Sequence, residues 1–308
     1  MADRAELLTL AGPVLRTYLE DPGAIEILVN PNGTCFVERY GQGMQDTAPP
    51  RPQDLDTFLA AIADSVHQEW REQSPSLHAA LPEAGWRIQA CRPPQAPGLT
   101  MALRKHPQQI YTLEDYQAKG ILTHAQIDVI GMLLKGRARI LISGATGSAK
   151  TSLTNACLHA LRETNERLAL LEDDPELICT VRNAVHFRTR PGVTMAHLVM
   201  DALRYRPDRI IVGEVRDGAA LAMCRAFETG HSGLCTVHAE SARGTLSRIE
   251  GLIQEVSTTP QSALIGSVID AIIHMERYAR TWRCTGILAV EGYAQGAYQT
   301  RALDRGET

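Results

Sequence analysis

The sequence predicts an α/β protein in which a smaller α+β domain precedes a larger domain built on a parallel sheet. From residue 127 onward, short aliphatic runs such as RILIS and RIIVGEV alternate with stretches of helical periodicity, the pattern of a parallel sheet with helices on both faces. Near the N-terminus, an Asn-Gly turn between two β-rich runs indicates a hairpin instead. The 308 residues suffice for two domains. We place these at residues 1–106 and 123–308, with a linker at 107–122.

The composition restricts the class of function. Hydrophobic residues make up 44% and charged residues 21%, which is typical of a soluble globular protein. A net charge of -4 argues against a chain that coats nucleic acid, and we expect no sequence-specific nucleic-acid binding. The seven cysteines form no CxxC pair. They indicate neither a zinc knuckle nor a redox dithiol, and we interpret them as small core residues in a reducing compartment.

The elements of the N-terminal domain are expected in the following order. An opening amphipathic helix carries its apolar residues at helical spacing (Leu7, Leu8, Ala11, Val14, Leu15 and Tyr18). Strands at 25–29 and 34–39 flank the turn NPNG, and a helix from Leu55 to Glu69 follows a proline-broken loop. Two strand-like runs, GWRIQACRPP and GLTMALRKHP, complete the domain. At the other end of the chain, HMERYARTWRCTGILAVEGYA is typical of a terminal hairpin.

The chain contains no segment that predicts membrane insertion. Charges within the first six residues favour an amphipathic helix over a signal peptide. No run of about 18 apolar residues occurs, so no transmembrane segment is expected. We therefore expect a cytoplasmic protein unless a partner holds it at a membrane.

A phosphate-binding loop is predicted between the strand RILIS and the helix that begins at Lys150. Successive backbone N–H groups in such a loop bind phosphate oxygens, helped by the helix dipole. Lys150 would neutralise the β- and γ-phosphates, and the Thr151 hydroxyl would ligate Mg²⁺. Ala149 stands where the usual pattern has glycine, and costs roughly 1–2 kcal/mol if that position needs a positive φ. The nucleotide-binding candidates are Gly144, Ala145, Thr146, Gly147, Ser148, Ala149, Lys150, Thr151 and Ser152.

Carboxylates follow two later strands of the predicted sheet. Glu172 and Asp173 end LALLEDD, and Glu214 follows RIIV. Ligands collect at the carboxyl ends of parallel strands, where the phosphate loop also lies. Glu172 and Asp173 are therefore candidates for Mg²⁺ contact or for polarising water, with solvated strand-end charges as the alternative. Glu214 suits activation of the attacking water, with capping of the next helix as the alternative.

Two histidines lie in the segment ETGHSGLCTVHAES. His231 and His238 are seven positions apart, a spacing that matches no usual zinc site. His231 on a Gly-flanked loop and His238 at a strand end could both face the γ-phosphate and report its presence. A structural role is the alternative for either one.

These four motifs, in this order, resemble the secretion ATPase superfamily of type II and type IV secretion systems. Its Walker A loop, Asp box, Walker B motif and His box would correspond to Gly144–Thr151, Glu172–Asp173, Ile210–Glu214 and Gly230–His238. The sequence that connects the motifs, including RTRPGVTMAHLVMDALRYRPDRIIVGEVRDGAAL, is similar to the conjugal-transfer branch of this superfamily, the TrbB-type ATPases. The N-terminal EILVNPNGTCFVERYG is similar to that family as well. The resemblance covers about residues 25 to 288.

The resemblance implies a RecA-like P-loop NTPase domain behind a PAS-like α+β domain. It further implies a homo-hexameric ring that binds ATP where the two domains meet. Arginines from the N-terminal domain would reach the phosphates: Arg104 matches the family's arginine before the linker, and Arg92 or Arg87 would be a second. The ring would act with conjugation machinery at the inner membrane, held there peripherally by its partners.

The function expected is therefore Mg-dependent ATP hydrolysis that powers conjugative transfer or pilus assembly through a type IV secretion system. The alternative, motivated by Ala149, is a ring subunit that binds nucleotide for a structural or regulatory purpose and hydrolyses little. A GTPase or small-molecule kinase is disfavoured, since no N-K-x-D tetrad occurs and no acceptor pocket is evident.

Overall fold

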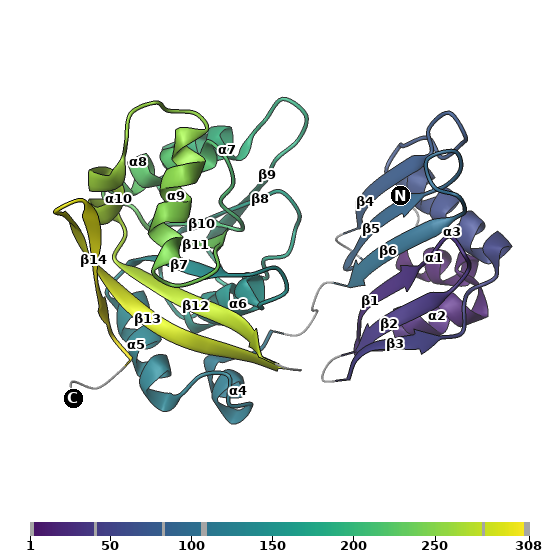
Figure 1. The fold of residues 1–308 in the computed structure, drawn as a ribbon, viewed down its shortest axis with the longest axis horizontal. Coiled ribbons are helices and arrows are strands. Elements are labelled where there is room, and N and C mark those ends of the chain that lie inside the picture. The colour runs from purple at the N-terminus through teal and green to yellow at the C-terminus, as the bar shows by residue number, and fades with distance from the viewer. Residues whose placement is uncertain (1–2, 40–41, 82–83, 106–109, 279–280, 305–308) are drawn as a thin grey trace. The chain divides into compact units, whose positions relative to one another are not determined.

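The computed structural model describes residues 3–39, 42–81, 84–105, 110–278 and 281–304. The chain divides into two compact units, Met1–Gln108 and Gln109–Thr308 (Figure 1). Each unit combines helices with one sheet, so the predicted α/β class with a smaller α+β unit at the N-terminus is confirmed. Among the described residues, no helix has both the length and the apolar character that crossing a bilayer requires.

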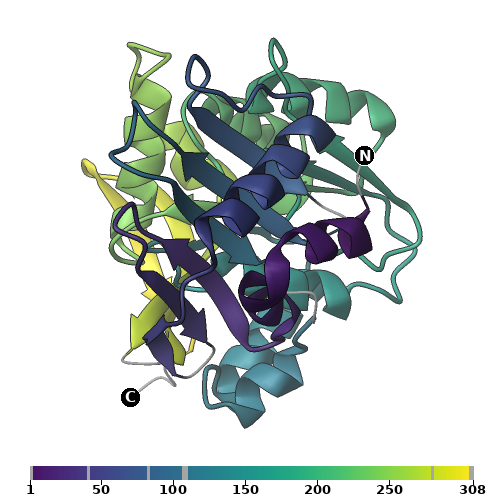
Figure 2. The same ribbon diagram turned by 90° about the vertical axis from the view of Figure 1, so that its right-hand side faces the viewer.

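The N-terminal unit is a six-stranded antiparallel sheet with three helices. The strand order is β3-β2-β1-β6-β5-β4, and the predicted hairpin around NPNG joins β1 to β2. The helices and the sheet together form one apolar core. In Figure 2 the helices lie across the strands. The strands are β1 Ala24–Val29, β2 Cys35–Arg39, β3 Gly43–Thr47, β4 Ser76–Leu81, β5 Trp86–Cys91 and β6 Thr100–Lys105, and the helices are α1 Arg4–Leu10, α2 Gly12–Glu20 and α3 Pro52–Ser65.

Two elements of this unit differ from the sequence prediction. The opening helix is two helices, because Gly12 adopts φ +69° and Pro13 follows it in the first turn of α2. Helix α3 runs from Pro52 to Ser65, whereas Leu55 to Glu69 was predicted: it begins earlier, since proline is well tolerated in a first helical turn, and it also ends earlier. Strands β3 and β4 were not predicted from the sequence.

The second unit is an eight-stranded sheet of order β14-β13-β12-β7-β11-β10-β8-β9. The six strands from β12 to β9 pair in parallel, and β13 and β14 continue the sheet antiparallel. The predicted terminal hairpin is therefore confirmed as β12 and β13. The strands are β7 Arg139–Gly144, β8 Leu168–Glu172, β9 Ala184–Arg188, β10 Arg209–Val212, β11 Ser232–His238, β12 Ala271–Tyr278, β13 Thr281–Ala294 and β14 Ala297–Ala302.

Helices cover both faces of this sheet, as the apolar strands predict. On one face, the sheet packs in an apolar cluster with α4 Leu113–Ala118, α5 His124–Lys135 and α6 Lys150–Ala160. On the other face, it packs in a second cluster with α7 Met195–Ala202, α8 Ala219–Glu228, α9 Gly244–Gln254 and α10 Ser262–Val268. Alternate residues of each central strand enter one cluster or the other: Ile140 and Ile142 of β7 pack on the α6 side, Leu141 on the α8 side.

The linker predicted at 107–122 is wrong for most of its length. Leu113, Tyr116, Ile121 and Leu122 are buried in the core of the second unit, and Thr112 caps α4 through a capping box. The proline and the polar residues of this segment favoured a linker over a helix. The short helix α4 nevertheless forms and packs through its few apolar residues. The predicted boundary at 106/107 lies outside the described residues.

The sheet topology brings the predicted motifs to one edge. His238 pairs with Gly144 at the ends of β11 and β7, and Val212 pairs with Leu171 near the ends of β10 and β8. Because these strands are parallel, the residues that follow them meet at their carboxyl ends.

Candidate active site

The phosphate loop runs from Gly144 to Ala149 and holds three residues at positive φ. Gly144 has φ +152°, Gly147 +72° and Ala149 +67°. A Cβ at Gly144 would lie 2.1 Å from the carbonyl oxygen of Met275 on β12, so only glycine fits there. Ala149, with ψ +28°, is in the left-handed region, and an alanine there costs roughly 1–2 kcal/mol. Ala149 therefore does adopt the positive φ that makes alanine unfavourable at this position.

Lys150, the first residue of α6, is buried beneath this loop. Its ammonium donates to the carbonyl oxygens of Gly144 at 3.0 Å and Ala145 at 2.9 Å. Its third contact, at 3.2 Å, is the Nδ1 atom of His238. Each of these groups can accept a proton of the ammonium group. A phosphate that binds Lys150 would compete with these acceptors.

His238, at the end of β11, bridges Lys150 and Glu214. Its Nε2 atom lies 3.2 Å from Oε1 of Glu214. Because an ammonium only donates, Nδ1 must accept from Lys150, and Nε2 then carries the proton and donates to the carboxylate. Burial and the charge of Lys150 lower the pKa of His238 despite the opposing effect of Glu214. The imidazole is therefore neutral at neutral pH.

Glu214 lies just beyond β10, held there by backbone hydrogen bonds from Gly213 to Leu171 and from Val215 to Thr236. Burial alone would raise the pKa of Glu214. A hydrogen bond from Arg216 at 2.6 Å and the charges of Arg216 and Lys150 outweigh it and lower the pKa below its ordinary value. Glu214 is thus an ionised carboxylate, well suited to orienting a water molecule and only weakly basic.

Glu172 is buried and Asp173 is exposed, and the two carboxylates have different partners. Oε1 of the buried Glu172 accepts from the backbone N–H groups of Glu176 and Leu177, at 2.8 and 2.6 Å, and so orders the segment after β8. Burial raises the pKa of Glu172 to about 7. Asp173 accepts from Thr189 at 2.8 Å. These contacts give Glu172 a structural role, and its direct role in catalysis and metal binding stays a prediction.

The other loop residues suit a nucleotide and Mg²⁺. The buried hydroxyl of Ser148 has no hydrogen-bond partner among the described residues. Thr151 and Ser152, half-buried, open α6 beside Lys150, while Ala145 and Thr146 are exposed at the loop surface. Within the described ranges, no group of three or more His, Cys, Asp or Glu residues can hold a metal.

His231 is not part of this site. It precedes β11, whose first residues pair with the start of β7, whereas His238 pairs with its end. The length of the strand therefore separates the two histidines by about 20 Å. The imidazole of His231 lies 3.1 Å from Thr229 Oγ1 and 3.2 Å from the Ala226 carbonyl. The prediction that both histidines face the γ-phosphate is wrong for His231.

The candidate arginines belong to the N-terminal unit. Arg104 is exposed on β6, opposite Glu26 and Arg87 in register. Arg92 lies 3.4 Å from Asp56 and 5.1 Å from the ring centre of Trp70. Their contact with a nucleotide held by the second unit stays a prediction.

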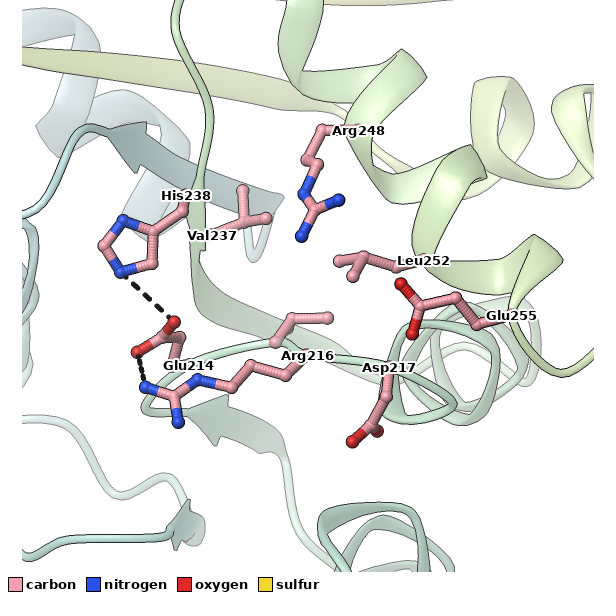
Figure 3. Close-up of a pocket in the computed structure, with 9 residues that line it drawn as sticks. Glu214, Arg216, Asp217, Val237, His238, Arg248, Leu252 and Glu255 are labelled. Carbon is pink, nitrogen blue, oxygen red and sulfur yellow. Dashed lines mark hydrogen bonds and ion pairs between the residues drawn. The ribbon is translucent and has the colours of Figure 1, made fainter.

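A cavity of about 290 Å³ adjoins Glu214 and His238 on the side of α9. Figure 3 shows Arg248, Leu252 and Glu255 on the α9 side of this space, and the guanidinium of Arg216 turned toward Glu214. Arg248 could not be singled out from the sequence, because an arginine on the exposed face of a helix carries no local signal. His274 and Trp282 carry no sequence signal either: His274 of β12 contacts Ser143, just before the phosphate loop, and Trp282 of β13 contacts Gly147 within it.

Comparisons with known proteins agree with this fold. Residues 68–292 match the family model of the Type II/IV secretion system proteins. The probable conjugal transfer protein TrbB of Sinorhizobium fredii is 37% identical over 291 residues, which cover 94% of this chain and 90% of that protein. The VirB11 ATPase of the Brucella suis type IV secretion system, solved with sulphate, is 27% identical, with a TM-score of 0.50 over 93% of this chain and 95% of that one. The ATPase DotB of Legionella pneumophila, 21% identical, shares the fold with a TM-score of 0.65 over 88% of this chain and 78% of its own. The chain therefore belongs to the type II/IV secretion ATPase superfamily, as its motifs predict.

Proposed function

We propose that this chain hydrolyses Mg-ATP and so powers conjugative transfer or pilus assembly through a type IV secretion system. The observation that carries the proposal is the contact chain from Lys150 through His238 to Glu214, at 3.2 Å for each step. It joins the cation of a phosphate loop to an ionised carboxylate of the kind that orients an attacking water.

In this mechanism, the loop N–H groups and Lys150 bind the β- and γ-phosphates. Glu214, kept ionised by Arg216, orients water for in-line attack on the γ-phosphate. A phosphate that takes a proton of Lys150 from His238 would change the partner of Nδ1, and the imidazole would pass this change to Glu214 through Nε2. His238 would thereby sense the γ-phosphate.

Mg²⁺ would be held by the Thr151 hydroxyl together with phosphate oxygens and water, and Asp173 would contact its water shell. The ion supplies positive charge that neutralises the phosphates during transfer. Arg104, with Arg92 or Arg87, would add a planar, permanent cation from the N-terminal unit.

We further propose a homo-hexameric ring, because the relatives are secretion proteins and ring subunits can couple ATP turnover to the movement of their domains. The ring would act in the cytoplasm, held at the inner membrane by components of the conjugation machinery. Light scattering with and without Mg-ATP tests the assembly. A mass that stays that of one chain under both conditions contradicts a ring.

Steady-state phosphate release with Mg-ATP tests the hydrolysis. We expect turnover well above that of Lys150→Ala, which removes the loop cation. A rate no higher than that of this variant would support a second function, nucleotide binding by a structural or regulatory ring subunit. The left-handed Ala149 is the observation that favours the second function, because it strains the loop on which transfer depends.

A further inference from the structure

The phosphate loop is held from outside by the β12–β13 hairpin, and we propose that Trp282 is a positioning residue that keeps Ala149 left-handed. This inference rests on the proposed nucleotide site and assigns a role to a residue far from every motif in the sequence.

The contact is a hydrogen bond between the side chain of Trp282 and the backbone of the loop. The indole Nε1–H donates to the carbonyl oxygen of Gly147 at 2.8 Å. The ring is half-buried and packs against the apolar cluster that also contains residues of α6. An indole N–H donates only, so its contact fixes the direction of the Gly147 carbonyl, two residues before Ala149.

The same hairpin contacts the other end of the loop. The Met275 carbonyl oxygen on β12 closes the space beside Gly144, where a Cβ would lie 2.1 Å away. The neighbouring His274, buried, lies with Nδ1 2.8 Å from the Ser143 hydroxyl. The described part of the hairpin therefore contacts Ser143, just before the loop, and Gly144 through β12, and Gly147 through β13. The Gly147 contact is the nearest of the three to Ala149 along the chain.

Ala149 is the residue that needs this support. With φ +67° it occupies a region that alanine disfavours, and a non-glycine residue stays there only where its surroundings force it to. Helix α6 gives no help, since no side chain caps its N-terminus at Ala149. When the Gly147 carbonyl is released, the peptides between Gly147 and Lys150 can rotate and relieve the strain. Their N–H groups then turn away from the phosphate position.

A double-mutant cycle with Trp282→Phe and Ala149→Gly tests this coupling. Phenylalanine keeps an aromatic ring and loses the N–H, and glycine accepts positive φ without strain. Equilibrium binding of Mg-ADP is the first readout, and KM and kcat for Mg-ATP are the second. In the parent chain we expect Trp282→Phe to weaken Mg-ADP binding about 5- to 10-fold, the size of one lost hydrogen bond. In the Ala149→Gly background we expect less than about 2-fold weakening.

The kinetic readout separates positioning from general loss of structure. In Trp282→Phe, KM for Mg-ATP should rise by about the factor by which Mg-ADP binding weakens. The value of kcat should change little, because the phosphates, once bound, hold the loop themselves. Tyr278→Phe, on the same hairpin and 65% exposed, is the control and should leave Mg-ADP binding unchanged. Thermal unfolding confirms that each variant is folded, and Trp282→His, which retains a ring N–H, should recover part of the affinity.

Equal weakening in both backgrounds, or none in either, overturns the inference. The proposed function fails separately: if the unaltered chain itself does not bind Mg-ADP, the nucleotide site is wrong. If it binds and the cycle is additive, only the role of Trp282 is wrong.

Discussion

The imidazole Nε2 atom of His238 lies 3.2 Å from Oε1 of Glu214, across the ends of two neighbouring parallel strands. The other ring nitrogen faces Lys150. One neutral side chain therefore connects the cation of the phosphate loop to the carboxylate that we assign to the attacking water. Substitutions at the three positions should affect hydrolysis by different routes.

Glu214→Gln should abolish most hydrolysis and leave ATP binding intact. The amide keeps the size of the side chain but loses the charge that orients water, and such groups contribute about 10²- to 10⁴-fold to rate. Phosphate release and equilibrium Mg-ATP binding, measured on the same preparation, check this. Unchanged turnover would remove Glu214 from the mechanism.

His238→Gln and His231→Gln should differ, although both residues belong to the predicted His box. The glutamine amide also has an acceptor and a donor, but its flexible chain does not fix both against Lys150 and Glu214 as the rigid ring does, so we expect turnover to fall at least about 10-fold, as for a lost catalytic hydrogen bond. His231 lies at the opposite end of β11, and its variant should keep the parental rate per site. A larger loss for His231→Gln would contradict the assignment.

Since protonation of His238 breaks the bridge and its pKa is lowered, turnover should hold down to pH values below the ordinary range of histidine.

Glu172→Gln should change the pH dependence of stability. The folded pKa of Glu172 is about 7, above the ordinary 4.5. The folded state therefore binds this proton more tightly than the unfolded state does. The contribution of this proton to the free energy of unfolding is complete below about pH 4.5 and is lost as pH rises through 7. Between pH 5 and 8 the free energy of unfolding should therefore fall by about 2–3 kcal/mol. Urea unfolding of both proteins over this range measures it. Glutamine is uncharged throughout and should remove this component. Parallel stability curves for the two proteins would show that Glu172 does not titrate in this range.

Glu166→Ala should destabilise the second unit strongly. Arg209 is 1% exposed and donates to Glu166 at 2.5 and 3.1 Å and to the Leu134 carbonyl at 2.6 Å. Removing the carboxylate leaves a buried charge without its counter-ion, which costs about 3–5 kcal/mol. Glu163→Ala is the matched control, because Glu163 pairs with Arg162 at the surface and should change little. Urea unfolding of both variants checks the difference, and equal midpoints would contradict it.

The fold and the centre of the site were predictable because their signals are local. A strand, a glycine-containing loop and a helix follow one another around Lys150, and parallel strands bring Glu214 and His238 to the same edge. His231 was misplaced because Gly230 and Gly233 suggested a loop. Gly233 lies inside β11, where a Cβ would come 2.0 Å from the Ile210 carbonyl oxygen.

What the sequence did not reveal depends on burial and on pairing between distant segments. Glu172 and Asp173 look alike in the sequence, yet only Glu172 is buried, and burial decides its hydrogen bonds and its pKa. Trp282 contacts the phosphate loop because β12 pairs with β7 and β13 with β12. No motif or spacing predicts that register.

The position of β12 also matters for the solubility of shortened chains. β12 pairs with one side of β7, whose residues from Ile140 to Gly144 are all buried. A chain that ends before β12 would leave β7 as an edge strand with unpaired backbone groups and an apolar sequence, a template for aggregation. Truncation from the C-terminus should therefore yield insoluble protein well before it reaches any of the nucleotide-binding motifs.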